Sequence, residues 1–146
     1  YEYYFSNNFT LPHIASHLDE IKPTWLTCVT SNQWSNLYLS DSIDFKLRSI
    51  GISRDMLKSE GFQFTQEQKD QLAYTEHSRW NVEKLLMGYR VLTDEEQKLT
   101  REEKKLLKNY LFAHYDIVPF SHLTDADKTL DYNIIQILPE CIRNID

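Results

Sequence analysis

The chain has 146 residues, a hydrophobic fraction of 41% and an aromatic fraction of 13%, with only three glycines and four prolines. These values are typical of one folded domain with a buried core, and they exclude an intrinsically disordered chain. A formal net charge of −6 argues against a general nucleic-acid binder, because such proteins need a basic surface to neutralise phosphates.

The first thirty residues predict one short helix and one short strand. Apolar residues at helical spacing predict a helix over His13–Ile21, which Pro23 ends. The segment Thr24–Thr30 is rich in β-branched residues and predicts a strand. Because the chain opens on Tyr1 rather than Met, we expect a C-terminal piece of a longer protein, in which residues 1–34 end an upstream domain or form a linker.

The pattern of residues 35–146 predicts a mainly α domain. Minor β content is expected only in the N-terminal segment before it. Ser35 or Asn36 is a suitable cap for a helix that runs to Ser49. Gly51 follows at the position where a left-handed residue stops a helix.

A long central helix is the strongest element of the pattern. A short helix over Arg54–Lys58 precedes it. Thr65 and Gln68 have the spacing of a capping box, which places the start of the central helix near Gln66. It runs to Met87, and Gly88 suits the left-handed position beyond its end.

A second capping box, Thr100 with Glu103, opens a helix through Tyr110. An irregular loop is expected over residues 112–120, where a proline interrupts the apolar pattern. The last helix is a separate element.

That last helix begins at a cap formed by Thr124 or Asp125. Its apolar residues lead to Pro139, beyond which we expect a final turn. The fold class is therefore a small, mainly helical domain.

Charged and apolar side chains share one face of the central helix. At 100° per residue, eight side chains fall within roughly 140° of one another, namely Leu72, Ala73, Glu76, His77, Trp80, Glu83, Lys84 and Met87. A charge held beside a desolvated indole costs several kcal/mol unless it is paired. Two interpretations stay open: an internal network that pairs Glu83 with Arg79, or a pocket with Trp80 as a stacking wall and Lys84 or Arg79 holding an anion.

Three motifs along the chain together resemble the ryanodine-receptor repeat, the RyR domain, as it occurs in bacterial proteins. The pattern E-H-x-x-W-x-x-x-K-x-x-x-G-Y begins at Glu76, and I-V-P-F-x-x-L begins at Ile117. A preceding segment, N-x-x-x-S-D-x-I-x-x-K-L-R-x-x-G, begins at Asn36. The resemblance covers roughly residues 35–140. It departs from the family pattern in Val91-Leu92 and in a helical insertion over residues 94–110.

The resemblance implies a non-catalytic regulatory or ligand-sensing module of a larger cytoplasmic protein, with a nucleotide-derived small molecule as its ligand. It also implies an upstream domain of the same chain as a partner, and a homo-oligomer is compatible with it. The alternative is a protein–protein interaction or oligomerisation domain that has no small-molecule ligand. Nothing in the sequence indicates a metal, a cofactor or a nucleic acid, and no apolar run reaches the ~20 residues of a membrane helix.

The expected ligand site combines aromatic rings with charged and polar groups. Trp80 with Tyr89 or Phe120 stacks a planar ring, and Lys84, Arg79 or Lys46 holds an anionic group. Asn36 or Asp41 is expected to form hydrogen bonds with polar groups at the edge of the ligand. The full set of expected ligand-binding residues is Asn36, Asp41, Lys46, Glu76, His77, Arg79, Trp80, Lys84, Tyr89 and Phe120. A hydrolase using Glu76 and His77 is disfavoured, because adjacent helical residues point about 100° apart.

Overall fold

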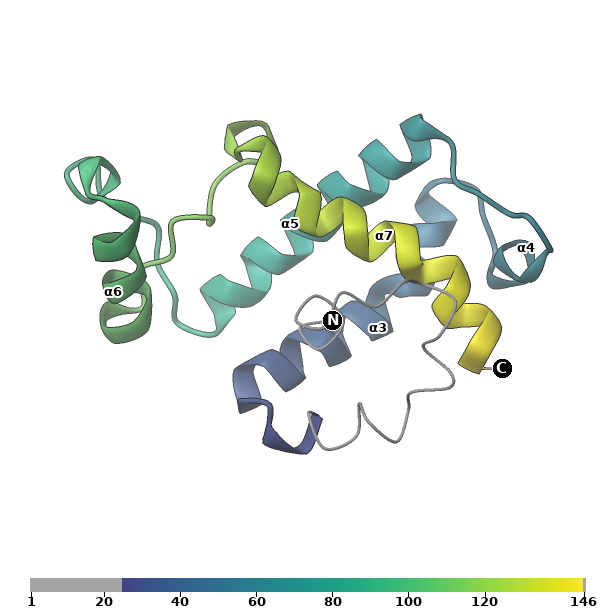
Figure 1. Cartoon of the computed structure of the whole chain (residues 1–146), viewed down its shortest axis with the longest axis horizontal. Helices are drawn as coiled ribbons and strands as arrows, with labels where there is room; N and C mark the ends of the chain where they lie inside the picture. The colour runs from purple at the N-terminus through teal and green to yellow at the C-terminus, as the bar shows by residue number, and fades with distance from the viewer. Residues whose placement is uncertain (1–24, 146) are drawn as a thin grey trace. The chain divides into compact units, whose positions relative to one another are not determined.

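The computed structural model of the chain describes residues 25–145, and helices dominate this part (Figure 1). In chain order the elements are α3 (Thr30–Ser49), α4 (Arg54–Lys58), α5 (Gln66–Leu86), the 3₁₀ turn η3 (Glu96–Lys98), α6 (Arg101–Leu111), the 3₁₀ turn η4 (Phe120–His122) and α7 (Asp125–Ile145). Between residues 25 and 145, β-structure is limited to an isolated bridge between Arg90 and Ala113. The predicted mainly α fold is confirmed.

The start of α3 differs from the prediction. The strand expected over Thr24–Thr30 is wrong for residues 25–30, because residues 25–27 are helical and α3 already begins at Thr30. Val29, rather than Ser35 or Asn36, is the N-cap. Its carbonyl accepts the backbone N–H groups of residues 32 and 33 at 2.9 and 3.1 Å. A segment of high β propensity forms a strand only when it pairs with another strand, and the described residues contain none. The helix predicted over His13–Ile21 lies outside the described residues.

The predicted end of α3 at Ser49 is confirmed, and α5 ends at Leu86, one residue before the predicted Met87. Both helices end in the same way. Gly51 and Gly88 have φ angles of +71° and +87°, the left-handed region that glycine enters without strain. At each end the glycine N–H and the following N–H donate back to carbonyls of the last turn, at 2.9 to 3.1 Å. This is the Schellman arrangement, which satisfies carbonyls that the helix leaves open.

The predicted starts of α5, α6 and α7 are confirmed. At the start of α5, Thr65 and Gln68 form a reciprocal capping box, with N–H donors at 2.9 and 3.2 Å from the side-chain oxygens. Thr100 and Glu103 form the same motif at α6. Of the two caps predicted for α7, Thr124 serves, since its hydroxyl oxygen accepts the N–H of residue 127 at 3.2 Å.

The chain forms two compact units. The first contains the described residues up to Leu72 and those from Tyr132 onward, and the second contains Ala73–Asp131. The predicted boundary at residue 34 stays a prediction.

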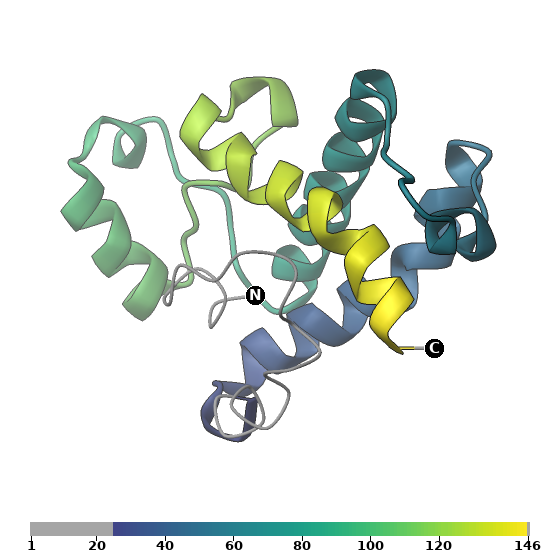
Figure 2. The ribbon, with the colours of Figure 1, turned by 45° about the vertical axis from the view of Figure 1, so that its right-hand side comes forward.

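The core of the first unit is an apolar cluster from α3, α4, α5 and α7, together with the segments that join them. Its members are Leu47, Ile52, Leu57, Phe64, Leu72, Ile135, Leu138 and Ile142. Figures 1 and 2 show the ribbons of α5 and α7, and the first unit's portions of these two helices contribute Leu72 and Ile135 to this one cluster. The burial of these apolar side chains is the main source of hydrophobic stabilisation in this unit.

Helix α7 continues through Pro139, where we expected the apolar run to end. Proline has a φ angle that a helix tolerates, and its missing N–H removes one backbone hydrogen bond. The turn that follows buries Ile142 to 3% exposure, which offsets that loss.

The second unit contains most of α5, all of α6 and the loop that leads through η4 into α7. Helix α6 has no buried residue, and Leu106, Tyr110 and Leu111 are exposed on it. No helix in the described part of the chain combines the length and apolar character that crossing a bilayer needs.

Candidate functional site

Helix α5 carries half of the predicted site residues, on consecutive turns of the second unit. Glu76, His77 and Lys84 are buried, with 2%, 4% and 8% of their surfaces exposed. The helix therefore holds ionisable groups in a region that excludes water, as the shared charged and apolar face predicts.

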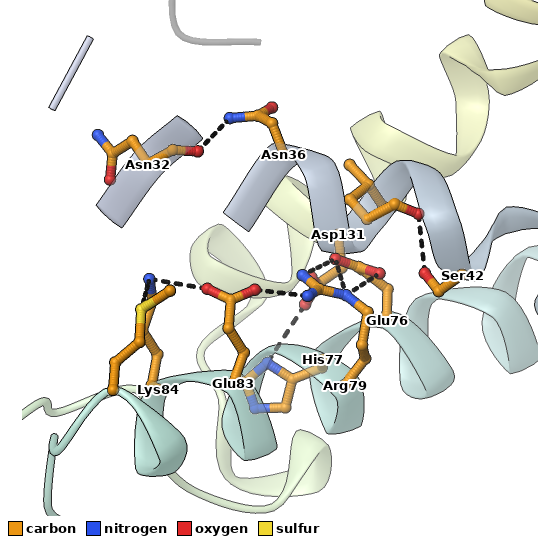
Figure 3. Close-up of polar contacts among 11 residues, drawn as sticks. Asn32, Asn36, Ser42, Glu76, His77, Arg79, Glu83, Lys84 and Asp131 are labelled. Carbon is orange, nitrogen blue, oxygen red and sulfur yellow. Dashed lines mark hydrogen bonds and ion pairs between the residues drawn. The ribbon is translucent and has the colours of Figure 1, made fainter. Parts of the chain in front are cut away.

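A guanidinium joins the two buried carboxylates (Figure 3). Arg79 donates from Nε and Nη2 to the Glu76 carboxylate, with its shortest contact at 2.8 Å, and from Nη1 to Glu83 Oε2 at 2.5 Å. Lys84 Nζ lies 3.1 Å from Glu83 Oε1. Two carboxylates and two cations thus form a balanced buried network, and the predicted pairing of Glu83 with Arg79 is confirmed.

His77 joins α5 to the loop before α7. Its Nε2 lies 2.8 Å from the carbonyl oxygen of Val118, and its Nδ1 lies 3.5 Å from Asp131 Oδ2. Burial alone would lower the pKa of His77, but the hydrogen bonds to Asp131 and Val118 outweigh it and raise that pKa. The Asn81 amide also donates to the Val118 carbonyl, at 2.9 Å, so two side chains of α5 fix one backbone oxygen of the loop.

The Trp80 indole packs between two imidazoles. The ring of His77 stacks on it at 5.8 Å, and the ring of His114 meets it edge-on at 4.9 Å. Phe120 contacts His77, and Tyr89 contacts His114, both at 5.8 Å between ring centres. These contacts fill the surroundings of the indole with protein groups.

The predicted residues are distributed over both units. Seven of them, Glu76, His77, Arg79, Trp80, Lys84, Tyr89 and Phe120, lie in the second unit in one chain of contacts. Asn36, Asp41 and Lys46 belong to α3 of the first unit. There the Asn36 amide donates to the carbonyl of Asn32, one turn earlier, at 2.7 Å, while Asp41 is exposed and Lys46 is buried.

The second unit also contains a cavity of about 410 Å³ that the sequence analysis missed. Its polar lining comes from α6, from the loop after α6 and from the start of α7, and it includes Arg101, Lys104, His114, Tyr115, Asp116 and Asp127. Val91, Leu92, Val118 and Leu123 form apolar walls. No residue of the predicted site lines it.

Known proteins give no guide to this cavity. No family model, curated protein or solved structure matches the chain. The chemistry of the site is therefore built from its own residues.

Two cations lie along the α6 side of the cavity. The guanidinium of Arg101 lies 5.9 Å from the centre of the Tyr115 ring, and its Nη2 lies 3.6 Å from Asp127 Oδ1. Lys104 follows one turn later on the same helix. The cavity thus offers cationic groups beside an aromatic ring.

His114 enters the cavity lining as a neutral imidazole. Burial, together with the nearby Lys108 and Lys84, lowers its pKa to about 3. Its Nδ1 accepts the backbone N–H of Asp116 at 3.2 Å, so its proton resides on Nε2. The contact of 3.8 Å between Nδ1 and the Asp116 carboxylate is consequently not an ion pair at neutral pH.

Asp116 titrates close to neutrality. Burial and the neighbouring Asp127 carboxylate raise its pKa to about 6. This aspartate is therefore a source of pH sensitivity in the cavity lining, because its pKa of about 6 lies near the physiological range.

Sequence patterns contained weak signals for this cavity. Arg101 and Lys104 are one helical turn apart in the insertion that departs from the RyR pattern, and His114, Tyr115 and Asp116 are consecutive in the predicted loop. Only the folded chain shows that these two segments line the same hollow. Among the described residues, no group of three His, Cys, Asp or Glu side chains is placed to hold a metal ion.

Proposed function

We propose that the chain is a non-catalytic ligand-sensing module of a larger cytoplasmic protein, and that it belongs to the RyR-domain family. We place its nucleotide-like ligand in the 410 Å³ cavity of the second unit. The combination of Arg101, Lys104 and Tyr115 in one cavity wall carries this proposal.

The size and lining of the cavity support a small molecule that has both a ring and an anionic group. Ligand pockets in proteins commonly measure about 300–1,000 Å³ and place a few polar groups among apolar walls. Here the Tyr115 ring offers a surface for a planar group, and Arg101 and Lys104 offer partners for a phosphate. Arg101 lies beside Tyr115 and Asp127 while its side chain stays 71% exposed, so the guanidinium is accessible to a ligand.

The motif residues on α5 take a supporting role in this proposal. Their charges are matched within the network of Arg79, Glu76, Glu83 and Lys84, so that network does not require a ligand to balance it. His77 and Asn81 instead hold the carbonyl of Val118, whose residue lines the cavity. The RyR-like motif would therefore shape the loop that forms one wall.

The geometry of Glu76 and His77 supports a non-catalytic module. Glu76 bonds to Arg79, whereas His77 bonds to Val118 and Asp131. The two side chains thus have separate partners and do not converge as an acid–base pair on one substrate atom.

A nucleotide panel tests the proposal on the full chain. Nucleoside mono- and diphosphates and a dinucleotide, each at millimolar concentration, are screened by thermal unfolding and then by calorimetric titration. A ligand at 100 times its Kd stabilises the folded state by about 2.7 kcal/mol, so the unfolding temperature should rise clearly.

The controls compare three lysine and arginine variants on one helix. Arg101→Glu and Lys104→Glu should each abolish the stabilisation, because they place a carboxylate where the anion binds. Lys105→Glu is the matched control, since Lys105 is exposed on α6 and does not line the cavity. The proposal fails if no nucleotide stabilises the chain, or if Arg101→Glu and Lys104→Glu bind like Lys105→Glu.

A further inference from the structure

Helix α3 has an apolar stripe on the side opposite its core side. Its core side contributes the buried Leu47 and the partly buried Ile43 and Ile50. At 100° per residue, Trp34, Tyr38 and Phe45 lie within about 40° of one another on the other side. They are 49%, 46% and 66% exposed, and Leu37 beside them is 44% exposed.

We infer that this stripe pairs with the same stripe of a second copy of the chain, the two α3 helices running antiparallel about a twofold axis. The order of side chains along the stripe is what favours a copy as the partner. Trp34 and Phe45 are equally far from the point between residues 39 and 40, and Tyr38 and Asp41 are equally far from that same point. An isologous interface needs such symmetry, because each contact occurs twice.

The pairing brings complementary groups together. A twofold axis at that point sets Trp34 against Phe45 of the second copy and Tyr38 against Asp41 of the second copy. The first pair buries two aromatic rings, and in the second a phenol O–H donates to a carboxylate, a strong charge-assisted hydrogen bond. Trp34 and Tyr38 already stack on each other at 5.8 Å within one chain, so the aromatic surface is preorganised.

The area available suits a weak dimer that forms at high chain concentration. With roughly 200 Å² for each large side chain, the four apolar residues expose roughly 400 Å² per copy at the fractions given above. Two copies would cover roughly 800 Å². The flanking Asp41 and Arg48 are also exposed and extend this area toward the ~1,000 Å² expected of a specific interface. A patch of roughly 400 Å² falls within the range of the largest apolar patches on protein surfaces, which are often interaction sites.

Sedimentation equilibrium on the full chain between 1 and 200 µM tests the dimer. The expected mass at high concentration is twice the 17.4 kDa of one chain. Phe45→Glu should weaken the dimer at least tenfold, because it sets a carboxylate against the indole of Trp34. Tyr110→Glu is the matched control, an aromatic-to-acid exchange at a 75% exposed position on α6, and should leave the dimer unchanged.

Cross-linking gives a second readout that does not depend on the folding of Phe45→Glu. In a Cys28→Ser, Cys141→Ser background, chains with Tyr38→Cys are mixed with chains with Asp41→Cys and oxidised. A disulfide should join them, since the proposed axis brings these two positions face to face. Ser40→Cys, exposed on another side of α3, should not join with Asp41→Cys.

A chain that stays monomeric at 200 µM would overturn this inference. So would a dimer that Phe45→Glu and Tyr110→Glu weaken equally, or cross-linking that is equal at positions 38 and 40. These outcomes are independent of nucleotide binding, because the stripe lies on the first unit and the cavity on the second.

Discussion

Replacing Arg79 by methionine removes the cation that joins two buried carboxylates while it keeps much of the side-chain volume. Glu76 and Glu83 have side chains only 2% and 3% exposed, and the Arg79 side chain is 16% exposed. Breaking a buried ion pair by deleting one partner costs about 3–5 kcal/mol, because a charge then stays in a region of low dielectric without that partner. A domain of ordinary stability has about 5–15 kcal/mol in total.

Urea unfolding at pH 7, followed by circular dichroism, measures this loss. With a slope of about 1–3 kcal/mol per molar urea, the midpoint should fall by at least about 1 M. Arg79→Lys should show a smaller fall, since it keeps the charge and loses the two-pronged contact with Glu76.

Arg90→Met is the matched control for this experiment. Arg90 also makes a two-pronged contact, to Glu96 at 2.7 Å, but its side chain is 44% exposed and water screens the pair. If Arg79→Met shifts the midpoint no further than Arg90→Met does, the buried network does not stabilise the fold and the reasoning from burial is refuted.

Three further predictions concern pH and backbone conformation. Because the pKa of Asp116 is raised to about 6 from 3.8, the folded state binds more protons between these values, so stability falls as pH rises through that window; Asp116→Asn should remove this fall, at most about 3 kcal/mol, in urea titrations from pH 4 to 7. His114, with its pKa lowered to about 3 from 6.5, has the opposite sign, and stability is lost as pH falls through that range; His114→Gln should flatten this acid limb, and an unchanged limb would contradict the assignment of a neutral imidazole. Gly88→Ala should lower the free energy of unfolding by about 1–2 kcal/mol, since φ is +87°, and thermal unfolding that matches the wild type would exclude backbone strain there.

The helix boundaries were largely predictable because the signals are local. A capping box needs two residues three positions apart, and a helix stop needs one glycine, so Thr65, Thr100, Gly51 and Gly88 were readable from the sequence. The pairing of Glu83 with Arg79 is likewise a contact across one helical turn.

The features that the sequence did not predict correctly all depend on contacts with distant parts of the chain. β-branched residues at 24–30 predict a strand only where another strand is available to pair with, and residues 25–30 lack one within the described chain. Pro139 stays inside α7 because the burial of Ile142 stabilises the helical turn that follows the proline. The cavity needs α6 and the loop at His114 to meet, and no periodic pattern encodes that meeting.

The loop is anchored through a backbone oxygen, which bears on the substitutions that position 118 tolerates. His77 and Asn81 both bond to the carbonyl of Val118, a group that every amino acid possesses, and residue 118 also lines the cavity. Position 118 is therefore open to exchange without loss of the loop's attachment. If the proposed ligand binds in this cavity, an exchange at position 118 changes its surroundings while the histidine and the asparagine keep the loop in place.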